Sequence, residues 1–373
     1  MKRILLIGGG SGGHVYPLIA VANALQEKSQ QSGVALEMKL WGRGDFIVNA
    51  ATEANLKATK IIAGKLRRYF SFLNILDFFK VILSFFQSLW LMFWYMPDVI
   101  FAKGGSDSVM PAIVAKLYFI PLIIHESDSV PGLANRVTSK VANKVLISFE
   151  SSAKYFKPEK TTLVGNPVRK ELAMGDKSSA ASLFKLDPNK QTVLVFGGSQ
   201  GAQKINSLIL DSIVQLTQAY QIIHQCGDSH YAKMKQEIEK YEKEGEASYG
   251  SLLLNNYRLF PFLNFQELKS AYAMADVIIS RGGGQVFEIA MVGKPAIIIP
   301  LPTSAGNHQM ENALEFSRFG ASILEEDNLT SHILMSQIAS ILKPENYQSI
   351  SEKIRQFAKP EAADNIAQLI LNT

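Results

Sequence analysis

The sequence predicts an α/β protein built from two doubly wound domains, each organised around a parallel sheet. Short apolar runs alternate with helical segments along most of the chain. Glycine-rich turns follow the runs at 3–7, 192–196 and 277–280, as is usual where a parallel strand leads into a helix. The chain has 373 residues, which is long for one hydrophobic core, so two domains are the default expectation.

The composition indicates a globular protein with one basic half. Hydrophobic residues make up 47% of the chain and charged residues 19%, which excludes extensive disorder. The single cysteine, Cys226, has no partner for an internal disulfide, so a reducing cytoplasm is expected. No Cys/His cluster has the spacing of a zinc site. Residues 1–165 hold 19 Lys+Arg and 11 Asp+Glu, whereas residues 166–373 hold 19 and 22. The basic half predicts an anionic partner: a membrane surface, a phosphorylated substrate or nucleic acid.

The first half of the chain alternates strands with helices. Helices are expected at 17–28 and at about 110–118. The expected strands are 3–7, 36–41, 60–62, 98–102, 121–124, 144–148 and 162–164. Together these elements predict one parallel, doubly wound sheet.

A glycine-rich turn, residues 8–13, separates the first strand from its helix. Its glycines are too dense for a clean dinucleotide-binding G-x-G-x-x-G, so the turn suits a polar or phosphorylated ligand and not NAD. His14 follows the turn. Its pKa range suits proton transfer near neutrality, but the residue pattern by itself favours a structural role in capping the helix.

Polar residues also follow the strand at 121–124, where the chain reads His125-Glu126-Ser127-Asp128. Open α/β sheets place ligand groups at the carboxyl ends of their strands. One of these side chains, or His14, is therefore a candidate for deprotonating a hydroxyl group.

An unusually apolar segment covers 72–96. Its stretch 81–96 has about 16 uncharged residues, fewer than the ~20 needed to span a bilayer, so we do not expect a transmembrane helix. We expect the later part of the segment to lie in the core. The part near 65–79 begins with the cations Lys65, Arg67 and Arg68 beside aromatic residues, which predicts contact with an anionic membrane surface.

The second half repeats this organisation after a turn-rich stretch at 173–190. Helices are expected at 204–219 and 231–246, and a final amphipathic segment at 350–371. The expected strands are 192–196, 222–225, 252–255, 277–280 and 296–300. The turn at 197–202 has the same strand-to-helix position as the turn at 8–13, so the chain predicts two Rossmann-like domains in tandem.

The turn Arg281-Gly282-Gly283-Gly284 leads from an apolar strand into a helix. Its backbone N–H groups and the helix end suit a phosphorylated ligand. Glu288 lies one turn into that helix, where a carboxylate can accept hydrogen bonds from the two hydroxyls of a ribose. The pattern favours a nucleotide site, although a tight strand-to-helix connection would have the same glycines.

Five motifs in chain order carry a family resemblance. They are G-G-G-S-G-G-H-V-Y-P at 8–17, H-E-S-D-S-V-P-G-L-A-N at 125–135, V-G-N-P-V-R at 164–169, G-G-S-Q-G-A at 197–202 and S-R-G-G-G at 280–284. Together with the two domains, they resemble the GT-B nucleotide-sugar glycosyltransferases. Within that class they are similar to the bacterial cell-wall transferases that convert lipid I to lipid II.

The resemblance implies a GT-B fold, with two Rossmann-like doubly wound domains facing a cleft. Residues 1–165 would form the acceptor and membrane-side domain, joined by a C-terminal helix at about 350–373, and residues 166–349 would bind the UDP-sugar. The implied reaction transfers N-acetylglucosamine, with inversion, from UDP-N-acetylglucosamine to the 4-hydroxyl of the muramoyl unit of lipid I. Neither a cofactor nor a metal is implied.

The resemblance also assigns roles to residues. The implied base is His14 or Glu126. Glu288 would bind the ribose, Arg169 and Ser199 the phosphates, and Gln309 the sugar, while the backbone of Phe262 or Leu263 would meet the uracil. The turn residues that would line the donor are Gly283, Gly284, Gln285, Val286 and Phe287. The residues that would approach the acceptor and its diphosphate are Ser11, Gly12, Gly13, Asp128 and Asn135.

The implied partners are lipid I, the anionic inner-membrane surface and a cell-wall synthesis complex, with no nucleic acid. The protein is then expected on the cytoplasmic face of the cell membrane as a peripheral protein. Two alternatives stay open. One is a GT-B transferase with another UDP-sugar or another lipid-linked acceptor, and the other is a nucleotide-binding scaffold at the membrane that transfers no sugar.

Overall fold

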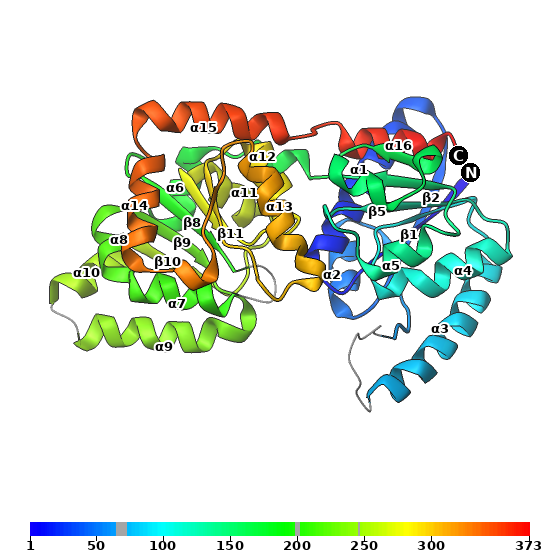
Figure 1. Cartoon of the computed structure of the whole chain (residues 1–373), viewed down its shortest axis with the longest axis horizontal. Helices are drawn as coiled ribbons and strands as arrows, with labels where there is room; N and C mark the ends of the chain where they lie inside the picture. Colours follow the sequence, from blue (N-terminus) through cyan, green and yellow to red (C-terminus); the bar gives the residue numbers. More distant parts are fainter. Residues whose placement is uncertain (65–72, 198–201, 245–246) are drawn as a thin grey trace. The chain divides into compact units, whose positions relative to one another are not determined.

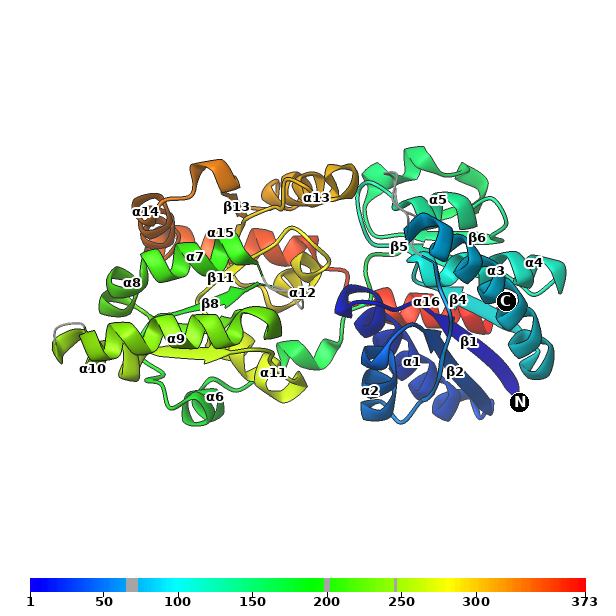
Figure 2. The same cartoon turned by 90° about the horizontal axis from the view of Figure 1, so that it is seen from below.

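The chain folds into two compact units in this computed structural model, whose described residues are 1–64, 73–197, 202–244 and 247–373. Unit 1 comprises Met1–Arg169 together with Lys359–Thr373, and unit 2 comprises Lys170–Ala358. In each unit, a parallel sheet lies between helices (Figures 1 and 2). From the sequence, we expected the chain to enter the second domain near residue 165 and to return to the first near residue 349. The chain returns to unit 1 at Lys359, later than expected.

The described part of unit 1 contains a seven-stranded parallel sheet in the order β3-β2-β1-β4-β5-β6-β7. The strands are β1 (Lys2–Ile7), β2 (Leu36–Gly42), β3 (Lys57–Lys60), β4 (Val99–Ala102), β5 (Leu122–Glu126), β6 (Lys144–Ile147) and β7 (Thr161–Leu163). Side chains alternate between the two faces of a strand, so Ile4 and Leu6 enter one core while Leu5 and Ile7 enter the other.

Helices cover both faces of this sheet. They are α1 (Gly12–Ser32), α2 (Asp45–Glu53), α3 (Leu73–Tyr95), α4 (Val109–Leu117), α5 (Leu133–Thr138) and α16 (Ala362–Leu371), with short 3-10 turns at Ser106–Ser108, Glu150–Tyr155 and Pro158–Lys160. Helix α16 lies beside α1, and both contribute buried residues to one core (Figure 1). The carboxyl-terminal helix therefore completes unit 1.

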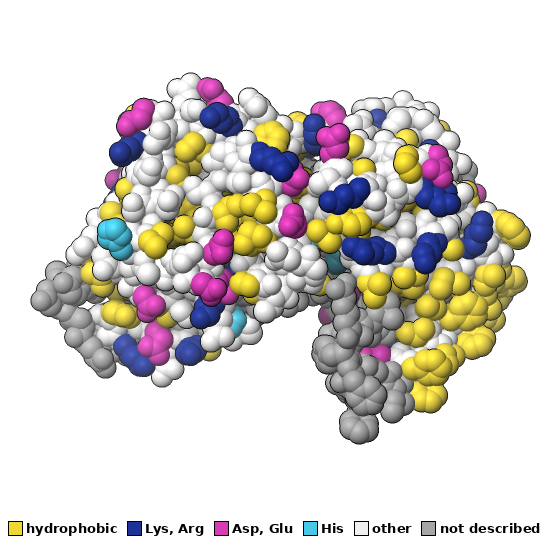
Figure 3. Space-filling model, viewed as in Figure 1, with side chains coloured by type: hydrophobic (Ala, Val, Ile, Leu, Met, Phe, Trp, Pro, Cys, Tyr) yellow, Lys and Arg dark blue, Asp and Glu magenta, His cyan; other side chains and the backbone are white. Residues whose placement is uncertain are grey.

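The expectation that the later part of 72–96 lies in the core holds for one side of the helix only, where Met92 and Tyr95 are buried in the core and Phe85, Leu89 and Leu91 pack against it. Helix α3 buries Ser84 and Ser88, whereas the aromatic rings of Phe86, Trp90 and Trp94 are 60%, 63% and 68% exposed. Helix α3 packs against its neighbour α4, and the face with Phe86, Trp90 and Trp94 stays uncovered within unit 1. Figure 3 shows hydrophobic side chains gathered at the lower right, where Figure 1 places α3.

The described part of unit 2 contains a six-stranded parallel sheet in the order β10-β9-β8-β11-β12-β13. The strands are β8 (Thr192–Phe196), β9 (Gln221–Gln225), β10 (Tyr257–Phe260), β11 (Val277–Ser280), β12 (Ala296–Ile298) and β13 (Ser322–Ile323). The strand expected at 252–255 is wrong. These residues end helix α10, which buries Leu253 and exposes Leu254, and the edge strand begins only at Tyr257.

The helices of unit 2 flank this sheet on both sides. They are α6 (Lys177–Phe184), α7 (Gln203–Asp211), α8 (Ile213–Ala219), α9 (Asp228–Glu244), α10 (Ala247–Asn256), α11 (Phe265–Met274), α12 (Gln285–Val292), α13 (His308–Ser317), α14 (Ser331–Ile341) and α15 (Pro344–Phe357), with 3-10 turns at Lys170–Ala173, Ala305–Asn307 and Glu326–Asn328. The single helix expected at 204–219 is broken at Ser212, whose hydroxyl donates back to Leu208 O at 2.7 Å.

The segment expected to be one amphipathic element at 350–371 is divided between the two units. Phe357 at the end of α15 packs against Phe287, Phe316 and Phe319, with ring centroids 5.0–5.3 Å apart. Residues 358–361 then separate α15 from α16 and include Pro360, which cannot donate to a helical hydrogen bond. Aromatic packing therefore keeps α15 in unit 2, while α16 belongs to unit 1.

Candidate functional site

The first-unit site begins at the carboxyl end of β1, where the glycine turn leads directly into α1. Ser11 occupies the N-cap position, and the helix starts at Gly12, so His14 lies within the first turn of the helix. Among the described residues, His14 Nδ1 is buried without a hydrogen-bond partner. Burial lowers the pKa of His14, and the nearby Lys103 charge lowers it further. The imidazole is therefore held in its neutral form, which is the form that accepts a proton.

Glu126 organises the loop after β5. Its Oε1 accepts from Asp128 N at 2.9 Å, and its Oε2 accepts from Gly132 N at 3.2 Å and from Asn135 Nδ2 at 2.9 Å. Burial and the charge of Asp128 raise the pKa of Glu126 to about 7, and the N–H donors oppose that rise. Both carboxylate oxygens are thus engaged in fixing the loop, which makes Glu126 a poorer base candidate than His14.

A lysine that the sequence interpretation did not select lies between these groups. Lys103 follows β4 and is 1% exposed, with Nζ 2.6 Å from His125 Nδ1 and 2.8 Å from Asn166 Oδ1. The only available signal was its position: it ends an apolar strand and precedes Gly104 and Gly105 at the edge where ligand groups gather.

Arg169 is the last residue of unit 1 before the chain enters unit 2. Its guanidinium lies 4.2 Å from the centre of the Tyr16 ring, and the residue is 8% exposed. A planar guanidinium held against a ring is pre-oriented for a phosphate, because less side-chain freedom is lost on binding. The phosphate-binding role expected for Arg169 stays a prediction.

The second-unit site is the turn after β11. A Cβ placed on Gly282 would lie 2.2 Å from the carbonyl oxygen of Gln309, so only glycine fits there. Asn312 Nδ2 donates to Gly282 O at 2.9 Å, and Gln309 Oε1 accepts from Leu301 N at 3.0 Å. Helix α13 therefore holds the turn in place. The side-chain oxygen Oε1 of Gln309 is bonded to the Leu301 backbone, so its side-chain Nε2 is the group expected to meet a sugar.

Glu288 lies in the first turn of α12, directly after this glycine turn. Tyr272 donates its hydroxyl hydrogen to Glu288 Oε2 at 2.8 Å, and Gln285 Nε2 donates to the same hydroxyl oxygen at 3.3 Å. Ser280 Oγ in turn donates to Gln285 Oε1 at 3.1 Å. The carboxylate is thus oriented by a chain of side chains that begins at the end of β11. Sequence reasoning missed Tyr272, since its helix shows no local motif.

Burial limits how the other residues expected at the donor site can contact a ligand. Val286 and Phe287 are buried in unit 2, so only their backbone groups remain to face a ligand. Leu263 is also buried, and its N–H already donates to Gln225 Oε1 at 3.0 Å, which favours Phe262 as the residue that offers backbone to a base. Ser199 lies outside the described residues.

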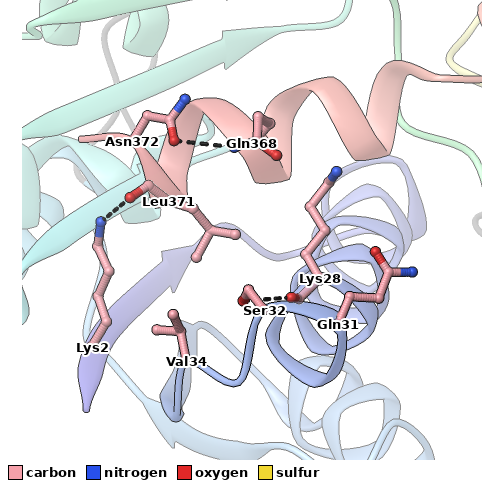
Figure 4. Close-up of a pocket in the computed structure, with 8 residues that line it drawn as sticks. All are labelled: Lys2, Lys28, Gln31, Ser32, Val34, Gln368, Leu371 and Asn372. Carbon is pink, nitrogen blue, oxygen red and sulfur yellow. Dashed lines mark hydrogen bonds between the residues drawn. The ribbon is translucent and has the colours of Figure 1, made fainter.

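A surface pocket of about 390 Å³ lies at the opposite end of the first sheet (Figure 4). It lies by the amino end of β1, where Lys2 Nζ donates to Ile370 O at 3.1 Å and to Leu371 O at 2.6 Å. These contacts satisfy carbonyl groups at the end of α16, which is a structural task. Across the described ranges, no cluster of three or more His, Cys, Asp or Glu side chains is placed to hold a metal ion.

Comparison with known proteins adds to this geometry. Residues 4–147 match the glycosyltransferase family 28 N-terminal domain, and residues 192–369 match the family 28 C-terminal domain. UDP-N-acetylglucosamine–N-acetylmuramyl-(pentapeptide) pyrophosphoryl-undecaprenol N-acetylglucosamine transferases of Treponema denticola and Borrelia turicatae are 34% and 35% identical. These alignments cover 97% and 99% of the chain and 94% and 96% of the relatives. The crystal structure of MurG from Acinetobacter baumannii superposes with a TM-score of 0.71 at 24% identity, covering 100% of both chains.

Two parallel-sheet units and the match to a solved structure of the same architecture show the GT-B fold, and the two domain matches are to glycosyltransferase domains. The fold class was predicted from the sequence, and these comparisons confirm it. The chain belongs to glycosyltransferase family 28, by both domain matches and by its identity to whole relatives.

Proposed function

We propose that this protein transfers N-acetylglucosamine from UDP-N-acetylglucosamine to N-acetylmuramyl-(pentapeptide) pyrophosphoryl-undecaprenol, converting lipid I to lipid II. Full-length identity to transferases of that name supports the reaction. The observation in this structure that carries the proposal is the oriented carboxylate of Glu288 behind the glycine turn. A nucleoside diphosphate requires an acceptor for its ribose hydroxyls and N–H donors for its phosphates. The carboxylate of Glu288 is the acceptor, and the backbone N–H groups at the N-terminus of α12 are the donors.

The donor is bound, in this proposal, at the turn of unit 2. Glu288 accepts hydrogen bonds from the ribose, and the amino end of α12 faces the diphosphate. Arg169 offsets phosphate charge, and the amide of Gln309 meets the sugar. Charge that develops on the departing UDP is then stabilised by a guanidinium and by helix-end N–H groups.

His14 is the proposed general base of unit 1. It removes the proton from the 4-hydroxyl of the muramoyl unit, and that oxygen attacks the anomeric carbon of N-acetylglucosamine as the bond to UDP breaks. One displacement of this kind inverts the anomeric carbon. The lowered pKa of His14 keeps the imidazole unprotonated near neutrality, which is the state this step needs. The turn from Ser11 to Gly13 and the loop with Asp128 and Asn135 are proposed to face the acceptor and its diphosphate.

The aromatic face of α3 is proposed to bind the membrane that carries the acceptor. Of the described helices, one segment, Asp77–Tyr95, is long and apolar enough to cross a bilayer by length and composition, and 22% of its most apolar stretch is buried. Its other side packs against α4, so we propose that it lies in the interface. Lys and Arg side chains border the upper side of the hydrophobic patch in Figure 3, which suits anionic headgroups. The expected cation cluster Lys65, Arg67 and Arg68 lies outside the described residues.

The transfer is tested with the pure protein, labelled UDP-N-acetylglucosamine and a lipid I analogue. Lipid II is the expected product, and Glu288→Ala is expected to weaken UDP binding by roughly 10-fold or more through lost hydrogen bonds to a charged group. Glu315→Ala is the control, because Glu315 is a half-buried helix carboxylate of unit 2 that pairs with Arg318. Transfer of a different sugar, or no transfer at all, would reject the proposal.

Membrane binding is tested separately by flotation with vesicles of phosphatidylglycerol and neutral lipid. Replacing Phe86, Trp90 and Trp94 with serine is expected to abolish flotation. Serine at Leu183 and Leu254, which are exposed apolar residues of unit 2, provides the control. Undiminished flotation of the α3 variant would remove the assignment, and a change of oligomeric state without loss of flotation would assign this face to a second copy of the chain.

A further inference from the structure

The ammonium group of Lys103 is buried at the edge of the first sheet where the acceptor-side residues gather. Its backbone N–H donates to Ile7 O at 2.8 Å, so β1 fixes the position of the residue. Its side chain is 1% exposed, and its Nζ contacts His125 Nδ1 and Asn166 Oδ1. A lysine is rarely buried unless its charge has partners, since removing the charge from water is costly.

The direction of each hydrogen bond in this cluster follows from one carbonyl group. His125 Nε2 lies 2.9 Å from Gly165 O, and a carbonyl can only accept, so Nε2 carries the hydrogen. His125 Nδ1 is then the acceptor, and Lys103 donates to it at 2.6 Å. Lys103 also donates to Asn166 Oδ1 at 2.8 Å. Lys103, the residue after β4, thereby connects to His125 near the end of β5 and to Asn166 just after β7.

His14 packs against the same backbone. A Cβ at Gly8 would lie 3.2 Å from Lys103 Cβ and 3.7 Å from the carbonyl oxygen of His14, so both residues pack on this glycine. A Cβ at Gly105 would lie 3.9 Å from His14 Nε2, which places the imidazole over the loop that follows Lys103.

The charged groups around His14 have opposing effects. Burial and the Lys103 side-chain charge lower the pKa of His14, whereas Asp128, a hydrogen bond with the Lys103 backbone and Asp107 raise it. Arg43 partly offsets Asp107, with Nε 3.9 Å from its carboxylate. Burial lowers the pKa of Lys103 to about 7 against the pull of Glu126 and Asp128, so the ammonium charge is about half present at neutral pH and becomes complete as the pH falls. That is the range in which an ordinary histidine would become protonated.

We infer that Lys103 is a positioning residue for the transfer reaction: its buried ammonium joins three strand ends and places a positive charge in the region against which the base His14 packs. The role of His14 as base rests on the proposed function, whereas the effect of Lys103 on the charge of His14 does not. Replacing the lysine with an apolar side chain of similar length removes the positive charge. The pKa of His14 then rises, by about 0.5–1 pH unit.

The test is a titration of the full chain with isotope-labelled histidine, followed by NMR. The His14 signal is assigned with His14→Gln, and its pKa is compared between the wild type and Lys103→Met. Lys160→Met is the matched control, because Lys160 also belongs to unit 1 and donates to Ala142 O at 2.7 Å. The expected result is a raised His14 pKa in Lys103→Met and an unchanged value in Lys160→Met.

Activity provides the second readout. The acid limb of the kcat/KM profile is expected to move to higher pH by the same amount in Lys103→Met, whereas a purely structural role would lower the rate equally at every pH. An unchanged His14 pKa in the folded variant overturns the inference. If Lys103→Met does not fold, Asn166→Asp is used in its place. Its new carboxylate offsets the ammonium charge of Lys103 and should raise the pKa of His14. An unchanged His14 pKa in Asn166→Asp also overturns the inference. Absence of sugar transfer would reject the proposed function and leave the titration valid.

Discussion

Tyr272→Phe is the sharpest test of how the donor site is built. The variant removes one oxygen atom that donates to Glu288 Oε2 at 2.8 Å and accepts from Gln285 Nε2 at 3.3 Å. Tyr272 is 1% exposed, so water has little access to replace the lost hydroxyl. One hydrogen bond to a charged group, of about 1.5–3 kcal/mol, and one neutral bond, of about 0.5–1.5 kcal/mol, predict a loss of roughly 2–4 kcal/mol in the free energy of unfolding.

The binding consequence distinguishes orientation from general stability. Glu288 is expected to lose its fixed orientation, so UDP should bind about 3–10-fold more weakly, which corresponds to about 0.7–1.4 kcal/mol. Calorimetry with UDP and 2′-deoxy-UDP measures whether the preference for the ribose hydroxyl also shrinks. Tyr220→Phe, another buried tyrosine of unit 2, is the control. If Tyr272→Phe retained the full preference for UDP over 2′-deoxy-UDP, the orienting role of the hydroxyl would be refuted.

Two further predictions for unit 2 concern the substitution of Gly282 and the loss of folding stability at low pH. Gly282→Ala should destabilise the turn by about 1–3 kcal/mol and weaken UDP binding, because the new Cβ would lie 2.2 Å from Gln309 O. Gly283→Ala, whose Cβ would meet no described atom within 4 Å, should have little steric effect; equal losses in both variants by urea unfolding would contradict the reasoning. Burial lowers the pKa of His224 from 6.5 to about 3, so the unfolded chain binds the proton first and stability falls as the pH drops below 6.5. From pH 6.5 to 5 this contributes about 2 kcal/mol of lost stability, which should be absent in His224→Gln when both proteins are unfolded by urea at each pH.

The sequence determined the class of fold because its signals are local. Buried parallel strands need continuous apolar runs such as 192–196 and 277–280, and a glycine turn must follow where the backbone turns sharply toward a helix. Most strands of both sheets follow from this pattern, whereas the edge strands β10 and β13 were not expected. The strand expected at 252–255 failed because a short leucine run has no period, so a helix end and an edge strand look alike there.

Glu288 and His14 were found for the same reason: each lies within one turn of a glycine-rich strand end, which the sequence shows directly. Lys103 and Tyr272 could not be found that way. Lys103 reaches residues 22 and 63 positions away, and Tyr272 reaches a residue 16 positions away in another helix. Such contacts depend on which strands become neighbours, and no local spacing records that order.

The sequence by itself therefore determined the two parallel-sheet domains, the glycine turns and the family. Tertiary structure alone decided which polar groups are buried together, and so which carboxylate is held by hydrogen bonds and which imidazole is kept neutral. It also decided that α3 buries Ser84 and Ser88 and exposes Phe86, Trp90 and Trp94. The physical reason is that local propensity depends on neighbours in the chain, whereas burial and charge depend on neighbours in space.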